Sequence, residues 1–270
     1  MSEAIEQLKA NLPSHPPVDS LKPLEEDYTG LRILAVHAHP DDESSKGAGT
    51  ASAYIARGAR FMVATMTGGE RGDILNEEID KSPRAHRDLP GLRRAEMAAA
   101  REIMGIEHRW IGFFDSGLPE GDPMSPLPFG SFGTMPLDRA AAPLVRLVRE
   151  YRPHIIITYD EIGGYPHPDH IMTHKVAVEA FEKAGDPEAY VGEGEPWTPL
   201  KLYYDRAFNP ERTLALHEHL LDTHGESLLS GWIENLAHRT SSGEAPRHET
   251  TTRILVHEHF EQRDQALRAH

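Results

Sequence analysis

The 270-residue sequence contains no cysteine. Disulfide bonds, iron–sulfur clusters, thiolate zinc sites and a cysteine nucleophile are therefore excluded, and any metal ion must be held by His, Asp or Glu. Basic residues are also few, because 28 Lys and Arg stand against 43 Asp and Glu, which gives a formal net charge of −15. This excess argues against a nucleic acid or an anionic membrane as a partner. A small molecule is the favoured partner.

Long hydrophobic runs are lacking as well. No stretch approaches the roughly 18 apolar residues needed to span a membrane. The N-terminal segment carries Glu3 and Glu6 without the apolar centre of a secretory signal, so we expect a cytoplasmic protein. The proline-rich, acidic residues 1–29 are expected to form an N-terminal arm with one short helix near Glu3–Leu12.

From Leu31 onward, apolar runs alternate with helical patterns. Four runs have the composition of strands covered on both faces: 31–36, 59–67, 108–114 and 153–159. Helices are expected at 47–57, 92–104, 137–149 and 169–183. Because strands that alternate with helices form right-handed βαβ units, the sequence predicts an α/β fold with a Rossmann-like, doubly wound, mainly parallel sheet flanked by helices.

The C-terminal part has a different pattern. We expect a strand at 200–208, one or two helices within 210–237, a last strand within 251–260 and a closing helix. The expected domain organisation is the arm of residues 1–29 followed by one domain of residues 30–270. Residues 185–270 are expected to wall the substrate side of the active site.

Acidic residues and histidines gather after the first and fourth strands, in "HAHPDDE" at 37–43 and "HPDH" at 167–170. Buried carboxylates repel one another unless they are paired or bind a cation. For either motif alone, helix capping by its acids is an equally good interpretation. Because ligands bind where the carboxyl ends of such strands meet, the two motifs together can supply two His and one Asp, the ligand number of catalytic zinc.

Five segments in order resemble the LmbE/PIG-L zinc N-deacetylases over roughly residues 31–265: "AVHAHPDDES", "TGGERGD", "RRAEM", "DSGLPEG" and "YDEIGGYPHPDH". The resemblance implies a Rossmann-like fold and one Zn2+ per chain, held by His39, Asp42 and His170. Sites with such ligands also accept iron.

Roles for further residues follow from the same resemblance. Asp41 would be the general base, and His167 would protonate the leaving amine or stabilise the oxyanion. Asp169 would orient His167, unless it is simply a helix-start acid, and Tyr165 would donate to the developing oxyanion. Positions near the sugar of the substrate are matched by Glu70, Arg93 and Asp115, each of which could instead form a structural salt bridge.

Lys46 in "SSKGAGT" resembles the amidase branch of the family rather than the deacetylase branch. The expected reaction is zinc-dependent hydrolysis of the cysteinyl–glucosamine amide bond of a mycothiol S-conjugate, a small thiol–sugar conjugate. The products would be an acyl-cysteine S-conjugate and glucosaminyl-inositol.

Four alternatives stay open at the level of sequence. Within the family they are an N-acetyl-glucosaminyl-inositol deacetylase and a paralogue acting on a mycothiol adduct in lincosamide-type biosynthesis. The long segment before Leu31 and the early end at "EQRDQALRAH" keep the paralogue open. From other classes, "HAHPDD" is within one residue of the two-metal metallo-β-lactamase signature HxHxDH, and a non-catalytic ligand-binding module is the fourth.

Other histidines are interpreted as structural. His37 is expected to be packed or hydrogen-bonded rather than a ligand, and His174 to lie behind the site or in the core. The alternating pair His257 and His259 lacks a nearby carboxylate motif, and the histidines on the expected helix at 217, 219 and 224 are interpreted as mostly solvated.

Overall fold

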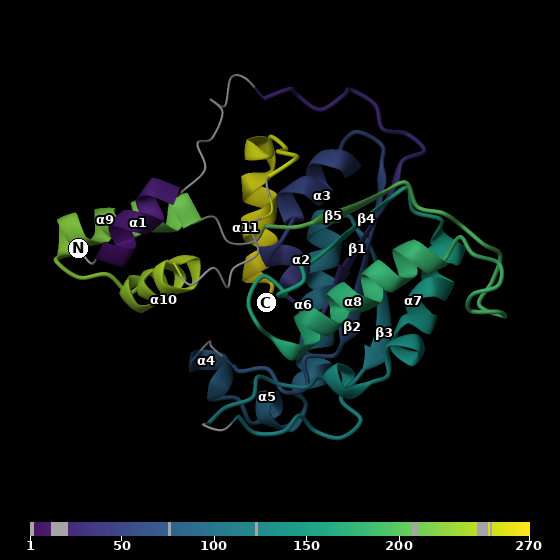
Figure 1. Ribbon diagram of the computed structural model, residues 1–270, viewed down its shortest axis with the longest axis horizontal. Helices are drawn as coiled ribbons and strands as arrows, with labels where there is room; N and C mark the ends of the chain where they lie inside the picture. Colours follow the sequence, from purple (N-terminus) through teal and green to yellow (C-terminus); the bar gives the residue numbers. More distant parts are fainter. Residues whose placement is uncertain are drawn as a thin grey trace. The chain divides into compact units, whose positions relative to one another are not determined.

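The computed structural model describes residues 3–11, 21–74, 77–121, 124–206, 210–241, 248 and 250–270. The chain divides into two compact units, one made of residues 1–23 and 206–254 and the other of residues 24–205 and 255–270. Among these described residues, the larger unit contains a five-stranded sheet and the smaller contains three helices (Figure 1).

All five strands of the sheet are parallel. They are β1 (Arg32–His37), β2 (Arg60–Thr67), β3 (Glu107–Phe113), β4 (Ile155–Thr158) and β5 (Lys201–Tyr204). The strand order β3-β2-β1-β4-β5 reverses between β1 and β4. This is the switch point at which doubly wound sheets bind ligands. The predicted α/β fold with a doubly wound, mainly parallel sheet is confirmed.

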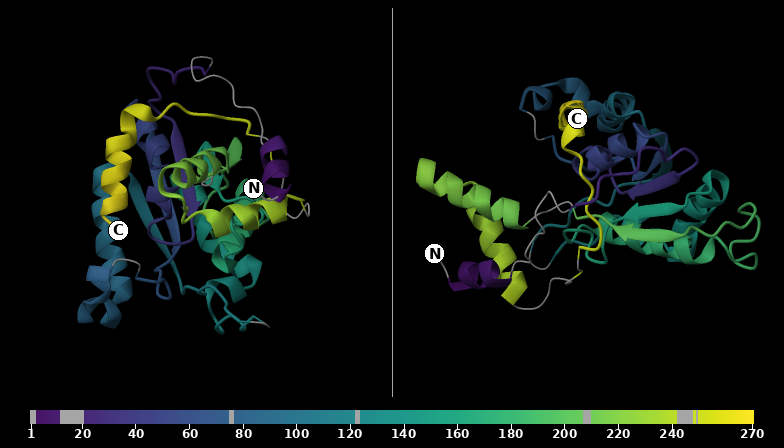
Figure 2. Two further views of the ribbon diagram at one scale, coloured as in Figure 1. Left: turned by 90° about the vertical axis from the view of Figure 1, so that its left-hand side faces the viewer. Right: turned by 90° about the horizontal axis from the view of Figure 1, so that it is seen from above.

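Helices cover both faces of the sheet (Figure 2). Ile33 and Ala35 of β1 face one core, which includes residues of α3 (Ala48–Ile55), α6 (Leu89–Met104) and α11 (Phe260–Arg268). Leu34 and Val36 face the other core, with α7 (Leu137–Tyr151) and α8 (Pro168–Lys183). Successive side chains of a strand point to opposite faces, so a strand between two helical layers must be apolar throughout.

One predicted strand is wrong. Residues 251–256 pair with no strand, and His257–His259 form a 3-10 helix, η3, that leads into α11. Val256 packs on a helix instead of a sheet edge: it lies against Gly49 of α3, where an added Cβ would meet it at 3.0 Å. The remaining short elements of the larger unit are α2 (Asp42–Ser45), α4 (Glu77–Asp80), α5 (Pro83–Arg87) and η2 (Phe132–Thr134).

The smaller unit consists of α1 (Glu3–Asn11), α9 (Pro210–His224) and α10 (Ser230–Ser241). Its core is a separate cluster formed by Ile5, Leu8, Leu214, Ile233 and Ala237. The expected short helix in the N-terminal segment is thus present, and it packs with helices from much later in the chain. The division into an arm of residues 1–29 and a domain of residues 30–270 stays a prediction. No helix in the described ranges is long and apolar enough to span a membrane.

Candidate metal centre

The two predicted motifs meet at the switch point of the sheet. The loop after β1 carries His39 and leads into α2, which begins with Asp42, while His170 lies in the first turn of α8. His170 Nε2 lies 3.2 Å from His39 Nδ1 and 3.6 Å from Asp42 Oδ2, and the latter two atoms are 3.7 Å apart. Ligands at about 2.0 Å from a tetrahedral zinc ion stand about 3.3 Å from one another. The three atoms therefore have the spacing of three ligands of one metal ion.

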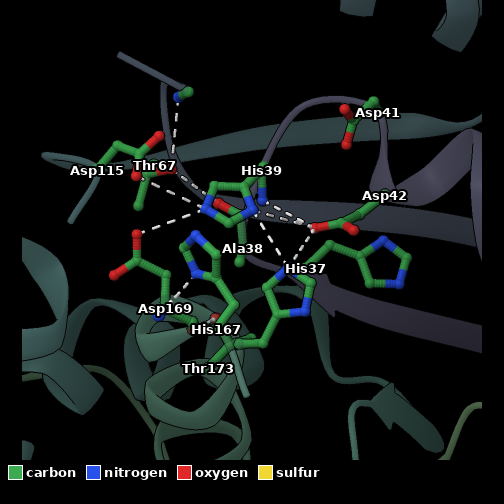
Figure 3. A network of polar contacts seen from close by, with 12 residues as sticks. His37, Ala38, His39, Asp41, Asp42, Thr67, Asp115, His167, Asp169 and Thr173 are labelled. Carbon is green, nitrogen blue, oxygen red and sulfur yellow. Dashed lines mark hydrogen bonds and ion pairs between the residues drawn. The ribbon is translucent and has the colours of Figure 1, made fainter. Parts of the chain in front are cut away.

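The orientation of the two imidazoles also fits a metal ion. His170 donates through Nδ1 to the carbonyl oxygen of Gly163, at 2.9 Å, and His39 Nε2 lies 3.4 Å from Asp169 Oδ2. A metal-binding histidine usually has its other ring nitrogen held in this way, which fixes the tautomer. The two remaining nitrogens face each other, and Figure 3 shows the ring of His39 between Asp42 on one side and Asp115 and Asp169 on the other.

Asp42 is buried and surrounded by donors. Its Oδ2 accepts hydrogen bonds from the Tyr159 hydroxyl at 2.5 Å and from the His39 amide at 3.0 Å, and its Oδ1 forms an ion pair with Lys46. Although burial opposes its charge, Lys46 and the nearby His170 hold the pKa of Asp42 well below its usual value. The carboxylate is therefore ionised, as a metal ligand must be.

The two histidines titrate very differently. Burial disfavours the charged form of both. At His39, the hydrogen bond to Asp169 and the charge of Asp42 outweigh burial and raise its pKa to about 9. At His170, burial prevails and lowers the pKa to about 3. Without a metal ion, one proton is therefore held on His39 where the two rings meet.

Asp41 has an unusual backbone. Its φ of 122° lies in a region that residues other than glycine rarely adopt, and its carboxylate accepts no hydrogen bond from any residue in the described ranges. Burial, followed by the charge of Asp42, raises the pKa of Asp41 to about 6. A carboxylate with a pKa near the working pH is suited to general-base chemistry.

His167 and Tyr165 stand on the α8 side of the centre. His167 caps α8 by accepting the Asp169 amide at Nδ1, at 3.2 Å, and its ring centroid lies 4.6 Å from that of His39. Burial and the neighbouring His39 lower the pKa of His167 to about 4. The Tyr165 ring, 37% exposed, stands edge-on to His170 at 4.7 Å.

Asp169 contacts two histidines of the site, His39 and His167. Its amide binds His167, while its carboxylate lies against His39 and accepts hydrogen bonds from the amide and hydroxyl of Ser116. The carboxylate thus contacts His39, whereas the contact with His167 is made by the Asp169 amide. That Asp169 orients His167 stays a prediction. Two overlapping sets of residues have one donor atom each within 4.8 Å of the others: His39, His167 and His170, and His39, Asp115 and Asp169.

The four residues expected to bind substrate are engaged within the chain. Glu70 Oε2 accepts the amides of Gly68 and Asp115, at 3.2 and 3.0 Å, and so ties together the loops after β2 and β3. Asp115 Oδ1 lies 3.8 Å from His39 Nε2. Arg93 pairs with Glu96 at 3.1 Å. Lys46, with a side chain 7% exposed, points to Asp42. Of these four residues, Asp115 contacts the proposed ligand His39 and Lys46 contacts the proposed ligand Asp42.

His37 and His174 lie outside the group formed by His39, Asp42 and His170, as expected. His37 is buried with its Nε2 3.5 Å from Asp205 Oδ2, and His174 bonds the carbonyl oxygen of Tyr159. Sequence reasoning missed Tyr159, whose ring stacks on His170 at 4.3 Å. It also missed Ser116. Tyr159 directly follows strand β4, which ends beside the site, and this position could have marked it as a candidate. Nothing in the sequence singles out Ser116.

Comparison with known proteins gives a consistent result. The sequence profile described as "PIG-L: GlcNAc-PI de-N-acetylase" matches residues 34–181. The chain is 50% identical over 242 residues to a mycothiol S-conjugate amidase from Streptomyces coelicolor, which covers 89% of this chain and 81% of the relative. It is 40% identical over 190 residues to a 1D-myo-inositol 2-acetamido-2-deoxy-alpha-D-glucopyranoside deacetylase from Streptomyces avermitilis, covering 68% of this chain and 64% of that protein.

The fold also matches solved structures. The crystal structure of the conserved protein TT1542 from Thermus thermophilus superposes with a TM-score of 0.55 at 21% sequence identity. The match covers 88% of this chain and 78% of the other. At this level of identity the likeness supports the fold alone, and it agrees with the parallel sheet described above.

Proposed function

Because this chain belongs to the GlcNAc-PI de-N-acetylase (PIG-L) family, we propose that it is a zinc-dependent amidase acting on mycothiol S-conjugates. The bond cleaved joins the cysteinyl carbonyl to the glucosamine nitrogen, and the products are an acyl-cysteine S-conjugate and glucosaminyl-inositol. The 50% identity to a mycothiol S-conjugate amidase over most of both chains supports this substrate over the N-acetyl sugar.

The observation that carries the proposal is the trio of donor atoms 3.2 to 3.7 Å apart on His39, Asp42 and His170. These residues would hold one zinc ion per chain. Iron would fit the same ligands, because nitrogen and carboxylate donors accept both metals. When bound, the ion supplies Lewis acidity that polarises the scissile carbonyl and makes water more acidic.

Residues of the chain perform the proton transfers. Asp41, adjacent to the ligand Asp42 and with a pKa raised to about 6, takes the proton of the attacking water. His167 accepts the Asp169 amide at Nδ1, so its neutral ring carries a proton on Nε2. That N–H donates a hydrogen bond to the developing oxyanion, and the proton taken up by Asp41 passes to the leaving amine. Tyr165 stands beside His167 and His170 and adds a phenolic donor for the oxyanion.

Glu70, Arg93 and Asp115 are proposed to face the sugar and inositol hydroxyls, which charged groups bind well. Lys46 is proposed to lie on the side of the cysteinyl group while it stays paired with Asp42.

A substrate panel tests the proposal. Purified protein with zinc is given a mycothiol S-conjugate, the N-acetyl-glucosaminyl-inositol and a mycothiol adduct of a lincosamide, and amine release is measured. We expect the highest kcat/KM for the S-conjugate. Faster cleavage of the N-acetyl sugar would assign the deacetylase reaction, and faster cleavage of the lincosamide adduct would assign the paralogue. Two metal ions per chain would favour the metallo-β-lactamase type of site.

The Asp41→Asn variant tests the chemistry. It keeps the size of the side chain and removes the base, so kcat is expected to fall by about 10²-fold or more, while the zinc content stays at one. Glu102→Gln, an exposed carboxylate on α6, is the matched control and should keep wild-type kcat. Ligand binding without turnover in the wild-type protein would instead indicate a binding module.

A further inference from the structure

A buried carboxylate lies directly behind the proposed base. Glu43, in α2, is 2% exposed. Its Oε2 accepts the backbone amide of Asp41 at 3.0 Å, and its Oε1 accepts the Ser44 hydroxyl at 2.6 Å and His270 Nε2 at 2.7 Å. The side chains alone are 1% exposed for Glu43 and 6% exposed for His270. The proposed chemistry uses neither residue, so their burial next to the base needs another explanation.

The bond from Glu43 falls on a strained residue. Asp41 has φ of 122° and ψ of −25°, and such a conformation persists in a residue with a Cβ only where its surroundings hold it. The Asp41 carbonyl is held by the amides of Ser44 and Ser45, at 3.1 and 3.0 Å. Glu43 holds the amide on the other side of the residue. Asp41 is therefore fixed at both ends, and its side chain is aimed by the backbone.

His270 comes from a distant part of the chain. It lies two residues beyond α11, which packs against α6, α3 and α2 (Figure 1). Ala266 of α11 is fully buried, and Gln262 donates to the carbonyl oxygen of Ile103 at 2.7 Å. A helix fixed in this way delivers the imidazole to one place beneath the loop that follows β1.

The charges around His270 explain why an imidazole is needed there. Its Nδ1 lies 3.9 Å from Glu96 Oε2, and Glu96 is paired with Arg93. Asp42 directly precedes Glu43 in the sequence and Asp41 lies two positions before it, so the region is rich in carboxylates. In the described ranges, His270 is the only basic side chain within 4.0 Å of the Glu43 carboxylate. A buried carboxylate without such a partner would have to take up a proton or move.

We propose that His270 is a positioning residue for the base: it holds one oxygen of Glu43, so that the other stays on the Asp41 amide and keeps Asp41 in its strained, productive conformation. The inference rests on the proposed function only in taking Asp41 as the base. The connection His270–Glu43–Asp41 itself is a matter of structure. It can therefore be tested with and without turnover.

The test without turnover follows the Asp41 amide by NMR in the full-length, zinc-loaded protein. In His270→Ala, the hydrogen-exchange rate of this amide should rise about tenfold or more, because Glu43 is released. The Thr67 amide, held by the Ala38 carbonyl at 2.9 Å, should exchange as in the wild type. An unchanged Asp41 amide would overturn the proposal, whatever the enzyme does.

The test with turnover separates positioning from mere packing. His270→Ala should lower kcat by about tenfold with KM and zinc content unchanged, as outer-shell partners do. His270→Gln, which can still donate to Glu43, should recover part of that loss. His257→Gln, an exposed histidine of the same C-terminal segment, is the matched control and should keep wild-type kcat.

A double-mutant cycle completes the design. Glu43→Gln keeps a carbonyl oxygen for the Asp41 amide but needs no cation, so Glu43→Gln combined with His270→Ala should lose less than the sum of the two single losses. Strictly additive losses, or a loss confined to thermal stability, would show that His270 only packs α11. If wild type has no amidase activity but its Asp41 amide depends on His270, the proposed function fails and the positioning inference stands.

Discussion

Two imidazole nitrogens face each other across 3.2 Å at the centre of the site. They cannot both present lone pairs there unless a cation lies between them. With the pKa of His39 raised to about 9 and that of His170 lowered to about 3, the metal-free protein meets this need with one proton on His39. A metal ion must displace that proton.

Metal affinity should therefore depend on pH in a defined way. Since His39 is protonated below pH 9 in the metal-free protein, the apparent zinc affinity should rise about tenfold per pH unit between pH 6.5 and 8.5 and level off above pH 9. Competition with a chromogenic chelator measures this slope. Calorimetry in two buffers should find about one proton released per zinc ion bound. A flat profile would contradict the assignment of the proton to His39.

The stability of the metal-free protein should change with pH in the opposite direction to its zinc affinity. In the metal-free protein, the raised pKa of His39 stabilises the folded state fully below pH 6.5, and this contribution is lost as the pH rises through 9.

Tyr159 is the second residue whose effect can be predicted. Its hydroxyl donates to Asp42 and accepts the Ala38 amide at 2.7 Å, so Tyr159→Phe removes a partner of a proposed ligand and leaves a buried amide unpaired. Zinc affinity should fall by about 10- to 100-fold. Tyr151→Phe is the control, because the Tyr151 hydroxyl is buried with no hydrogen-bond partner in the described ranges. Equal zinc affinities for the two variants would refute the role of Tyr159.

Among the elements, the loop between α8 and β5 depends on one side chain of α7. Arg149 is 4% exposed, and its guanidinium donates to five backbone carbonyls, those of Ala184, Asp186, Ala189, Tyr190 and Gly194. The fork of N–H groups on arginine suits this arrangement, whereas a single lysine ammonium cannot reach all five oxygens. The loop has no helix or strand of its own, so Arg149 fixes its path.

Arg149→Met should lower the free energy of unfolding by about 3 kcal/mol, because it removes the shared donor of five buried or part-buried carbonyls at once. Urea denaturation measures the change. Arg146, also on α7, binds Glu193 of the same loop but has a side chain 58% exposed. Arg146→Met should leave the free energy of unfolding nearly unchanged, and equal losses for both variants would show that the loop does not depend on the buried donor.

At the scale of the whole molecule, the two units have separate cores. The first helix of the chain shares its core with α9 and α10, which lie about 200 residues later in the sequence, while β1 to β5 belong to the other unit. Helix α1 therefore depends on α9 and α10 for burial, and each unit should respond to damage in its own core.

Leu8→Ala should destabilise the three-helix unit by about 3 kcal/mol, because Leu8 is 3% exposed in its core. Hydrogen exchange should speed up in α9 and α10 and stay unchanged in β1 and β2. Glu6→Ala, on the exposed side of α1, should leave both unaffected. Faster exchange across the sheet in Leu8→Ala would mean that the two units unfold together.

The sequence by itself determined the sheet and the place of the site. Runs such as 31–36 and 153–159 are apolar throughout because both faces of a parallel strand are buried, and that pattern is local. The motifs at 37–43 and 167–170 were visible for the same reason, since each is contiguous and follows a strand. The wrong strand within 251–260 shows the limit of this reasoning: an apolar, β-branched segment packs equally well on a helix, and only the fold decides which surface it meets.

Only the tertiary structure decided which atoms meet. The approach of His170 to His39, the contact of the Asp169 carboxylate with His39 instead of His167, and the roles of Tyr159 and Arg149 all join residues 35 to 131 positions apart. The contact of His270 with Glu43 spans 227 positions. Sequence patterns arise from the periodicity of one helix or strand, whereas these contacts depend on how elements pack, which no local pattern encodes.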